Sequence, residues 1–467
     1  MFSKILFFTL ITFNAIAGYR TAEDLYGKGS VAYAGHRRIV LNLVKDGYYF
    51  SAVPWMKEIL VTNRKMLDSE LEAAFDQILT ATGVKPFESL PIDLLSYSRS
   101  PHIRYILAKK LMKVGKNQDA LNELGKIDSD HIMYPFLAHM KGVLHSILNS
   151  NKEAETYFRD CIRSSESRIA GANPSTRKQL ELNRDYCLAG LGRVQFSSKN
   201  YKQAELSYLD IQKESFVWPE ILFEEAWNSY YLKNYNRTLG KLVSYKAPVF
   251  DFIFKPEVEV LKALTYLRMC LYDDAKKTID DFYADLYKPS KNLRAFINSR
   301  GKDYKYYYGL IADHEDGRSA PLPILDSILK SIRKDGAFIE MKSALGFALA
   351  EYQELSKKND SNLKRALMQN IKTVLDEYKT TIGAYVRSGM VTKYAELYSA
   401  FEGMSYIKLE MLALRKERLY KAETQVGKKR GDVKYIERND KQYFWTFNGE
   451  FWADELGDYV FALRSEC

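Results

Sequence analysis

Residues 188–208 read LAGLGRVQFSSKNYKQAELSY, and the fold depends on the spacing within this stretch. An apolar segment that contains Gly192 leads through the polar turn at 197–200 into a second apolar segment that contains Ala204. The twelve residues from Gly192 to Ala204 cover the end of one helix, a short turn and the start of the next. Two antiparallel helices can therefore cross most closely at these small residues, where a large side chain would push them apart.

This spacing occurs five times between Pro101 and Pro289. The pairs of small residues are Ala108 with Ala120, Gly142 with Ala154, Gly192 with Ala204, Ala226 with Thr238, and Ala263 with Ala275. The first member advances by 34, 50, 34 and 37 residues from copy to copy. Seven residues before it stand Pro101, Pro135, Pro219 and Pro256, with Asp185 in the remaining copy. Because proline suits the first turn of a helix, the four prolines predict helix starts.

A period of 34 residues is that of the tetratricopeptide repeat (TPR), and residues 101–289 resemble that family. Leu188-x-x-Leu191-Gly192 is similar to its first-helix pattern, and Ala154-x-x-x-Phe158 and Ala204-x-x-x-Tyr208 to its second. The family's early tryptophan is missing from every copy, and only the fifth has its tyrosine, Tyr266. The resemblance implies an all-α, right-handed α-solenoid of helical hairpins. The alternative is an unrelated helical bundle with chance spacing.

The sequence divides into five segments by composition and period. They are a signal peptide (1–17), a helical capping region with degenerate repeats (18–100), the TPR-like array (101–290), a long-helix extension of the solenoid (291–425), and a basic connector with an aromatic C-terminal module (426–467). Ala52 lies 68 residues before Ala120, which is twice the repeat length and supports degenerate repeats upstream. A projecting coiled-coil arm is the alternative for 291–425, although no strict heptad persists there.

The N-terminus has the pattern of a secretory signal. A short basic head precedes an apolar run at 5–13, and Ala15-Ile16-Ala17 forms a small-x-small cleavage pattern before Gly18. The alternative is an uncleaved anchor. No later run of about 18 apolar residues follows, so we do not expect an integral membrane protein. An exported bacterial protein, periplasmic or extracellular, is the expectation.

Four cysteines remain, Cys161, Cys187, Cys270 and Cys467, and an oxidising compartment would permit disulfides. Four thiols allow three pairings, which the sequence cannot rank by itself. In a TPR-like array, Cys161 falls late in one second helix and Cys187 early in the next first helix, and such helices pack together. A Cys161–Cys187 disulfide is therefore expected, with two buried apolar thiols as the alternative.

The net charge of +10 is spread along mixed-sign helices. An exported chain does not normally meet genomic DNA, so we expect no nucleic-acid partner. A solvated surface is the first interpretation, and attraction to an acidic partner or envelope polymer is the second.

The C-terminal stretch YFWTFNGEFW at 443–452 is dense in aromatic residues. Aromatic residues on both sides of Asn448-Gly449 predict a β-hairpin with a type I′ turn. Residues 454–463 predict a closing helix. We expect a small aromatic cap that seals the C-terminal end of the solenoid, and the alternative is an aromatic docking surface for a glycan or partner.

The sequence offers no catalytic, metal-binding or cofactor-binding residues. No two histidines have the spacing of a helical zinc pair, and the common nucleotide-binding and nucleophile-elbow motifs are absent. Soluble lytic transglycosylases also combine export with an α-superhelix. Glu88-Ser89 matches the start of their signature, but no Gly-Leu-Met-Gln follows.

What remains is recognition of another protein. In the TPR family, peptide-binding side chains lie one and four positions after the first small residue. The resemblance therefore implies a partner-binding groove formed by Lys109, Met112, Arg193, Phe196, Trp227 and Tyr230. Lys109 and Arg193 could clamp an acidic group, and the aromatic rings could stack on apolar or sugar groups. The alternative is that the rings only fill the stack.

The prediction is a non-catalytic scaffold or adaptor of a bacterial cell envelope. It would bind a protein or peptide partner through its concave face, with peptidoglycan or the outer membrane as a further surface of association. The alternative is a cell-wall-associated enzyme or glycan-binding protein, similar to lytic transglycosylases in architecture and centred on the C-terminal aromatic module.

Overall fold

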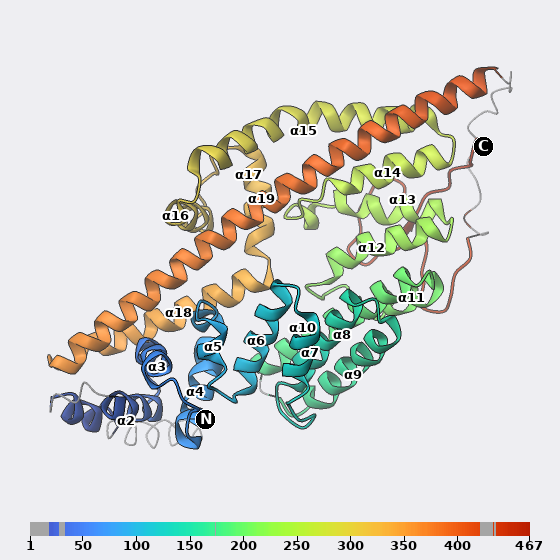
Figure 1. Ribbon diagram of the computed structural model, residues 1–467. Coiled ribbons are helices and arrows are strands. Elements are labelled where there is room, and N and C mark those ends of the chain that lie inside the picture. The colour runs from blue at the N-terminus through green and yellow to red at the C-terminus, as the bar shows by residue number, and fades with distance from the viewer. Residues whose placement is uncertain (1–17, 28–32, 173, 421–432, 434–435) are drawn as a thin grey trace, which may run out of the picture. The chain divides into compact units, whose positions relative to one another are not determined.

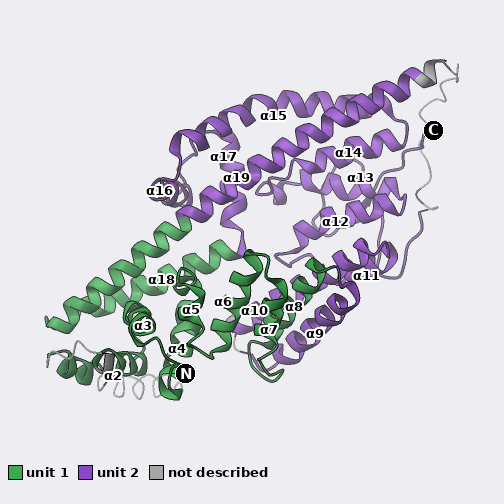
Figure 2. Cartoon of the chain, in the orientation of Figure 1, with its two compact units in different colours: residues 1–148, 337–382 green, residues 149–336, 383–467 purple. Residues whose placement is uncertain are grey.

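The computed structural model describes residues 18–27, 33–172, 174–420, 433 and 436–467. The predicted signal peptide, residues 1–17, lies outside them. Helices account for most of the described residues (Figure 1), so the prediction of an all-α chain with paired neighbouring helices is confirmed. The helices cluster into two compact units (Figure 2). Unit 1 contains Met1–Leu148 and Ala337–Ile382, and unit 2 contains Asn149–Gly336 and Gly383–Cys467.

The helices of unit 1 alternate with short turns. They are α2 (Tyr33–Lys45), α3 (Tyr49–Asn63), α4 (Ser69–Thr82), η1 (Lys85–Phe87), α5 (Ile92–Leu95), α6 (Pro101–Lys113), α7 (Asn117–Leu124) and α8 (Tyr134–Ile147), together with most of α18 (Gly336–Ser356) and the first part of α19 (Asn362–Tyr420). Helices α2 and α3 pack as a hairpin, as do α6 and α7.

Unit 2 contains the later repeats. Its helices are α9 (Asn151–Ile169), α10 (Pro174–Ser197), α11 (Tyr201–Leu209), α12 (Trp218–Tyr231), α13 (Tyr235–Val243), η2 (Ser244–Lys246), η3 (Pro248–Phe250), α14 (Glu257–Arg268), α15 (Tyr272–Arg300), α16 (Tyr304–Glu315), α17 (Pro323–Arg333) and the second part of α19. Three hairpins, α10/α11, α12/α13 and α14/α15, follow one another, and each contacts the next.

The turns inside the hairpins repeat with the period found in the sequence. A residue with positive φ stands seven positions after each first small residue, at Gly115, Asn149, Lys199, Lys233 and Cys270. At four of these turns the next residue donates its N–H to the carbonyl five positions back, for example Asn200 to Gln195 at 2.9 Å. This is the Schellman motif, which ends a helix and satisfies its last carbonyls. The repeats therefore share one backbone turn, whatever the residue in it.

The predicted helix starts are also found. Pro101, Pro135 and Pro219 lie in the first turn of α6, α8 and α12, and Pro256 caps α14. Asp185 differs because it lies in the middle of α10. The extra residues that make the second advance 50 instead of 34 lie mainly in the long helices α9 and α10.

The small residues lie where helices cross. A Cβ atom on Gly192 would overlap the ring of Tyr208 from α11, and one on Gly190 would overlap the ring of Phe158 from α9. Tyr208 and Phe158 are the aromatic residues of the second-helix pattern, and both are buried. Each ring therefore occupies the space that a glycine leaves on α10.

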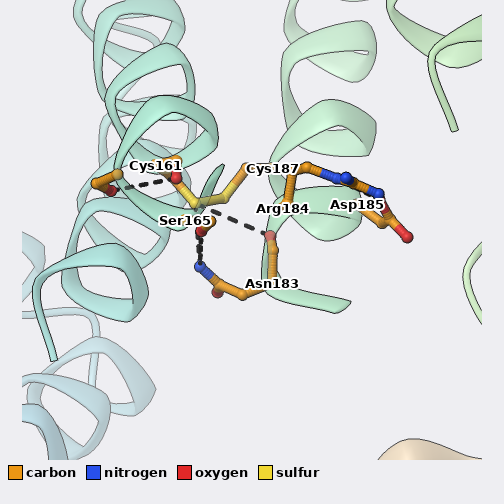
Figure 3. Close-up of a disulfide and its surroundings, with 7 residues drawn as sticks. Cys161, Ser165, Asn183, Arg184, Asp185 and Cys187 are labelled. Carbon is orange, nitrogen blue, oxygen red and sulfur yellow. Dashed lines mark hydrogen bonds and ion pairs between the residues drawn. A yellow bond between two sulfur atoms is a disulfide. The ribbon is translucent and has the colours of Figure 1, made fainter. Parts of the chain in front are cut away.

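The extended helices α9 and α10 are joined by a disulfide between Cys161 and Cys187, with Cα atoms 6.2 Å apart (Figure 3). Beside it, the Asn183 side-chain amide donates hydrogen bonds to Cys161 Sγ and Ser165 Oγ, both at 3.2 Å. A second disulfide joins Cys270, at the α14–α15 turn, to the last residue, Cys467. Both disulfides lie in unit 2.

Helices α18 and α19 return to earlier helices instead of adding hairpins to the array. In unit 1, the buried Glu351 of α18 accepts the backbone N–H groups of Phe50 and Ser51 at 2.9 and 2.8 Å. These groups belong to the first turn of α3, which has no side-chain cap of its own, so Glu351 acts as its cap. In unit 2, α19 packs alongside α15, where the Phe401 and Phe282 rings lie 5.0 Å apart (Figure 1).

The C-terminal module contains two short strands, β1 (Trp445–Thr446) and β2 (Tyr459–Val460), which pair in parallel. The predicted hairpin is therefore wrong. A type I′ turn needs positive φ at both central residues, and here Gly449 has it while Asn448 does not.

The predicted closing helix at 454–463 is also wrong. Gly457 has positive φ and donates its N–H to Ser244 Oγ at 3.0 Å. The residues before it form turns instead of a helix, and the extended strand β2 begins two residues after it. The module packs along α13, in the middle of unit 2, and not at an end of the repeats.

Candidate partner-binding surface

Two of the six predicted groove residues, Lys109 and Met112, lie on α6 in unit 1. The Lys109 ammonium contacts Glu88 Oε1 at 2.8 Å. Burial alone would raise the pKa of Glu88, but the hydrogen bonds and charges of Lys109 and, to a smaller extent, Lys85 outweigh burial and lower that pKa. Met112 packs against the buried cluster that contains Ala108 and Ala120. Both side chains are therefore engaged inside the chain.

The other four lie on α10 and α12 in unit 2, where three join one group of rings. We call this group the aromatic face; it consists of Phe196, Tyr201, Trp227, Tyr230, Tyr231 and Tyr235.

Most ring pairs of the aromatic face meet edge to face, as aromatic pairs prefer. Tyr201 and Tyr231 stack, and the pairs Trp227–Tyr231 and Tyr230–Tyr235 are tilted. Phe196 lies 5.3 Å from both Tyr201 and Tyr231, and the last two stack at 5.3 Å between centroids. Trp227 and Tyr230 are 5.6 Å apart, and Tyr230 lies 5.6 Å from Tyr235. The four helices α10 to α13 therefore contribute to one surface.

The aromatic face is neither fully buried nor loosely exposed. Trp227 and Tyr230 pack against the buried cluster around Phe223 and Ala226. Tyr231 is 48% exposed, and Phe196, Trp227 and Tyr230 are partly exposed. The interpretation that the rings only fill the stack thus accounts for one side of them. Their other side is open, as in the anchor residues of protein interfaces.

Two arginines border the aromatic face. Arg193 on α10 forms ion pairs with Glu224 at 2.6 Å and Glu220 at 3.1 Å, both on α12. Arg268 on α14 donates from Nε to the Tyr230 hydroxyl at 3.0 Å and reaches Glu410 of α19 at 3.6 Å. Arg193 is therefore already paired with two carboxylates, so an acidic group of a partner would have to compete for it.

Four residues of this surface were not predicted from the sequence, namely Tyr201, Tyr231, Tyr235 and Arg268. The repeat phase contains a signal for two of them. Tyr201 and Tyr235 are the first residues of α11 and α13, and Tyr272 begins α15 in the same way. In these three repeats the tyrosine at the start of the second helix lies beside the end of the first helix, because the hairpin turn is short; α7 and α9 begin with Asn117 and Asn151 instead.

The opposite side of the same repeats, formed by the second helices α11 and α13, is covered by residues 436–467, which we call the C-terminal segment. A Cβ atom on Gly240 of α13 would overlap the backbone oxygen of Tyr459 in β2. Asn236 exchanges two hydrogen bonds with the backbone of Leu463, at 2.9 and 3.0 Å. Phe461 donates its N–H to the backbone oxygen of Asn236 at 3.0 Å. The C-terminal segment therefore binds α13 through its backbone groups, as a β-strand binds its neighbour.

Charged residues are buried beneath the C-terminal segment. The Lys241 ammonium lies 2.5 Å from Glu225, and both side chains are almost fully buried. Arg237 pairs with Glu205 at 2.7 Å, and the Phe444 ring covers its guanidinium at 5.0 Å. At the edge of the segment, its own Asp458 pairs with Lys213 at 2.8 Å, and both side chains are partly exposed. The segment is therefore part of the folded core of unit 2.

Exposed aromatic residues also occur on the C-terminal segment, at Tyr443, Trp445 and Trp452. Three further rings of the segment, Phe447, Phe451 and Tyr459, pack inward. The segment therefore combines a structural role with an exposed aromatic edge.

A shallow depression in unit 1 is lined by Glu72, Ala73, Asp76, Arg99, Ser100 and Pro101. Its carboxylates contact polar groups at the start of α6. Asp76 accepts a hydrogen bond from Ser100 Oγ at 2.7 Å and contacts His102 Nδ1 at 2.8 Å. Burial alone would raise the pKa of Asp76, but its bonds to His102 and Ser100 lower it. The contacts of Asp76 therefore stabilise the start of α6.

Across the part of the chain that the structure describes, no three His, Cys, Asp or Glu side chains gather as a metal site. Within the same part, no helix combines the length and apolar character that crossing a membrane requires.

No protein-family model matches the sequence, and no curated protein matches it either. Among solved structures, the chain is similar to a chain of the APC/C hetero-tetramer Cut9-Hcn1, with 14% identity over 86% of this chain and 97% of that chain. The TM-score is 0.23, which is too low for the likeness to carry an argument. The assignment of repeated hairpins therefore depends on the helices, turns and crossings described above.

Proposed function

We propose that this protein is a non-catalytic scaffold or adaptor that binds a protein or peptide partner through the aromatic face of unit 2. One observation carries the proposal: Tyr231 is about half exposed and lies among the rings of Phe196, Trp227 and Tyr230. Of these rings, Trp227 and Tyr230 are held in place by a buried cluster beneath them. Rigid aromatic side chains lose little conformational entropy on binding and present a large apolar area. Interface energy is commonly concentrated in such residues.

The proposal includes a cellular setting outside the cytoplasm, within a bacterial cell envelope. Two disulfides in unit 2 are consistent with an oxidising compartment. The signal-like N-terminus of the sequence supports export. An association with peptidoglycan or the outer membrane belongs to this setting.

Cross-linked affinity capture of the mature protein from its native envelope tests the proposal. The double variant Trp227→Ala/Tyr231→Ala should lose the partner at least tenfold, because two anchor rings are removed. Thermal unfolding of the double variant should show a folded protein. A partner captured equally well by this folded variant would contradict the proposal.

A second candidate function is binding of a glycan or partner by the exposed aromatic edge of the C-terminal segment. The exposure of Trp445 and Trp452 favours it. Deletion of the segment is an unsuitable test, because its residues Leu456 and Tyr459 belong to the core. The variant Trp445→Ala/Trp452→Ala keeps the segment in place. Loss of capture with this variant alone would favour the second candidate.

A further inference from the structure

The two disulfides of unit 2 differ in how far they are buried. Cys161 and Cys187 join α9 to α10, and both residues are 0% exposed. Cys467 is exposed, and Cys270 is partly exposed. A disulfide is reduced when a thiolate attacks one of its two sulfur atoms, so the reaction requires access to that atom. In the folded chain, a reductant can therefore reach the Cys270–Cys467 bond and not the other one.

Besides this disulfide, residues 464–467 contact the α14–α15 turn through hydrogen bonds to one backbone oxygen. Glu466 donates its N–H to the backbone oxygen of Met269 at 2.9 Å, and Ser465 Oγ donates to the same oxygen at 3.3 Å. Hydrogen bonds that compete with water stabilise a contact only modestly, and Ser465 is exposed. The covalent bond is therefore the main attachment of residues 464–467 to the turn.

The chain before residue 464 has its own attachment to unit 2. Asn236 exchanges two hydrogen bonds with the backbone of Leu463 and accepts the N–H of Phe461. The side chains of Phe461 and Leu463 also pack against the buried cluster that contains Met269. Opening of the disulfide should therefore release residues 464–467 and leave residues 461–463 in place.

We propose that the Cys270–Cys467 disulfide is a modification site that a protein dithiol reductant opens. A thiolate of the reductant attacks the Cys467 sulfur, which is the more exposed one, and forms a mixed disulfide with it. Cys270 leaves as a thiolate and takes up a proton. The second thiol of the reductant then displaces Cys467, so the reductant ends as a disulfide and both cysteines end as thiols. The Cys161–Cys187 bond stays intact.

Reduction of this bond should also lower the thermal stability of unit 2. A disulfide restricts the unfolded chain, and the effect grows with the length of the loop that the bond closes. Cys270 and Cys467 are 197 residues apart in the sequence, whereas Cys161 and Cys187 are 26 apart. The bond that a reductant can reach is therefore also the one that restricts the unfolded chain more.

The first test compares the two disulfides within the full, folded chain. The protein is treated with dithiothreitol, and samples are alkylated with iodoacetamide and mapped by mass spectrometry. Cys270 and Cys467 should be alkylated at least about a hundredfold faster than Cys161 and Cys187, because the buried bond reacts only after local unfolding. Equal rates for the two bonds would overturn the proposal.

The second test identifies the sulfur that a protein reductant attacks. Thioredoxin whose second active-site cysteine is replaced by serine cannot complete the reaction, so the mixed disulfide accumulates. Mass spectrometry should find thioredoxin attached to Cys467. Attachment to Cys270, or no attachment at all, would overturn the proposal. Neither test needs the partner of the aromatic face, so the outcome is independent of the function proposed above.

The third test measures what the bond holds. In Cys270→Ser/Cys467→Ser, hydrogen exchange of the Glu466 amide should become at least about tenfold faster. Exchange of the Phe461 amide should not change, and unfolding should stay cooperative at a lower temperature. Ser465→Ala is the matched control, because it removes one hydrogen bond and keeps the disulfide. Equal acceleration by the control would overturn the proposal, as would a double variant that does not fold.

Discussion

The two sides of the α10–α13 repeats are built from the same helical hairpins, but the chain itself covers one side and leaves the other partly exposed. On the second-helix side, Gly240 leaves space for a strand, and Asn236 binds the strand's backbone, so the chain covers this side itself. On the first-helix side, Trp227 and Tyr231 present rings instead, and these stay partly exposed. The repeat geometry determines where side chains stand. The side chains at those positions determine whether the face is closed from within or left for another molecule.

Removal of one charge from the covered side should have the largest effect. Lys241→Met leaves Glu225 buried without its cation, and the free energy of unfolding should fall by about 3–5 kcal/mol. Replacement of both partners by methionine should recover most of this loss, because an apolar pair needs no desolvation of charge. Chemical denaturation of the single and double variants measures the difference. A double variant as unstable as the single one would show that the ion pair itself, and not its desolvation, stabilises the C-terminal segment.

Closure of the space at Gly240 should have the next largest effect. In Gly240→Ala, the new methyl group would overlap the backbone of Tyr459, which cannot swing aside as a side chain can. The expected destabilisation is about 1–3 kcal/mol. Gly309→Ala is the matched control, because a Cβ at that helical glycine would meet no atom within 4 Å beyond its chain neighbours and the backbone of its own helix. The control should be neutral or slightly stabilising by thermal unfolding. Equal unfolding temperatures for the two variants would show that the segment does not press on α13.

The architecture of the repeats could be predicted because it depends on local physics. A small residue, a proline and a turn recur with a fixed period, and each has a direct cause in helix packing or helix termination. The pairing of Cys161 with Cys187 followed from the same phase. The aromatic residues that begin α11 and α13 have the same period, and an alignment of the copies by phase would have revealed them.

The parts that could not be predicted depend on contacts between distant residues. The Asn448-Gly449 pair has hairpin chemistry, but β1 finds its partner beyond Gly457, where the chain is held by Ser244 and Lys241 of unit 2. Similarly, Lys109 stands at a groove position by sequence, but Glu88 reaches it from 21 residues away. Spacing can place a residue on a face and cannot reveal which distant group satisfies it.

The smallest predicted effect concerns this Lys109–Glu88 pair, a first-helix position that is satisfied within unit 1. Because the folded-state pKa of Glu88 is lowered, the pair contributes stability above the unfolded pKa of glutamate, about 4.3. That contribution should be lost as the pH falls through the lower folded-state pKa. As the pH falls from 5 through the folded-state pKa of Glu88, the free energy of unfolding of the wild type should therefore decrease by up to about 1 kcal/mol more than that of Glu88→Gln. Parallel pH profiles would show that Lys109 does not depend on Glu88.

Site-specific photo-cross-linking compares the two sides of unit 2 most directly. A benzophenone amino acid is placed at Tyr231 on the aromatic face or at Tyr443 on the C-terminal segment, and the native cells are irradiated. Tyr443 is the more exposed of the two, at 68% against 48%, so exposure alone would favour it. We expect a cross-linked partner from position 231 that Trp227→Ala abolishes, and none from position 443. A partner captured from position 443 and absent at position 231 would contradict it.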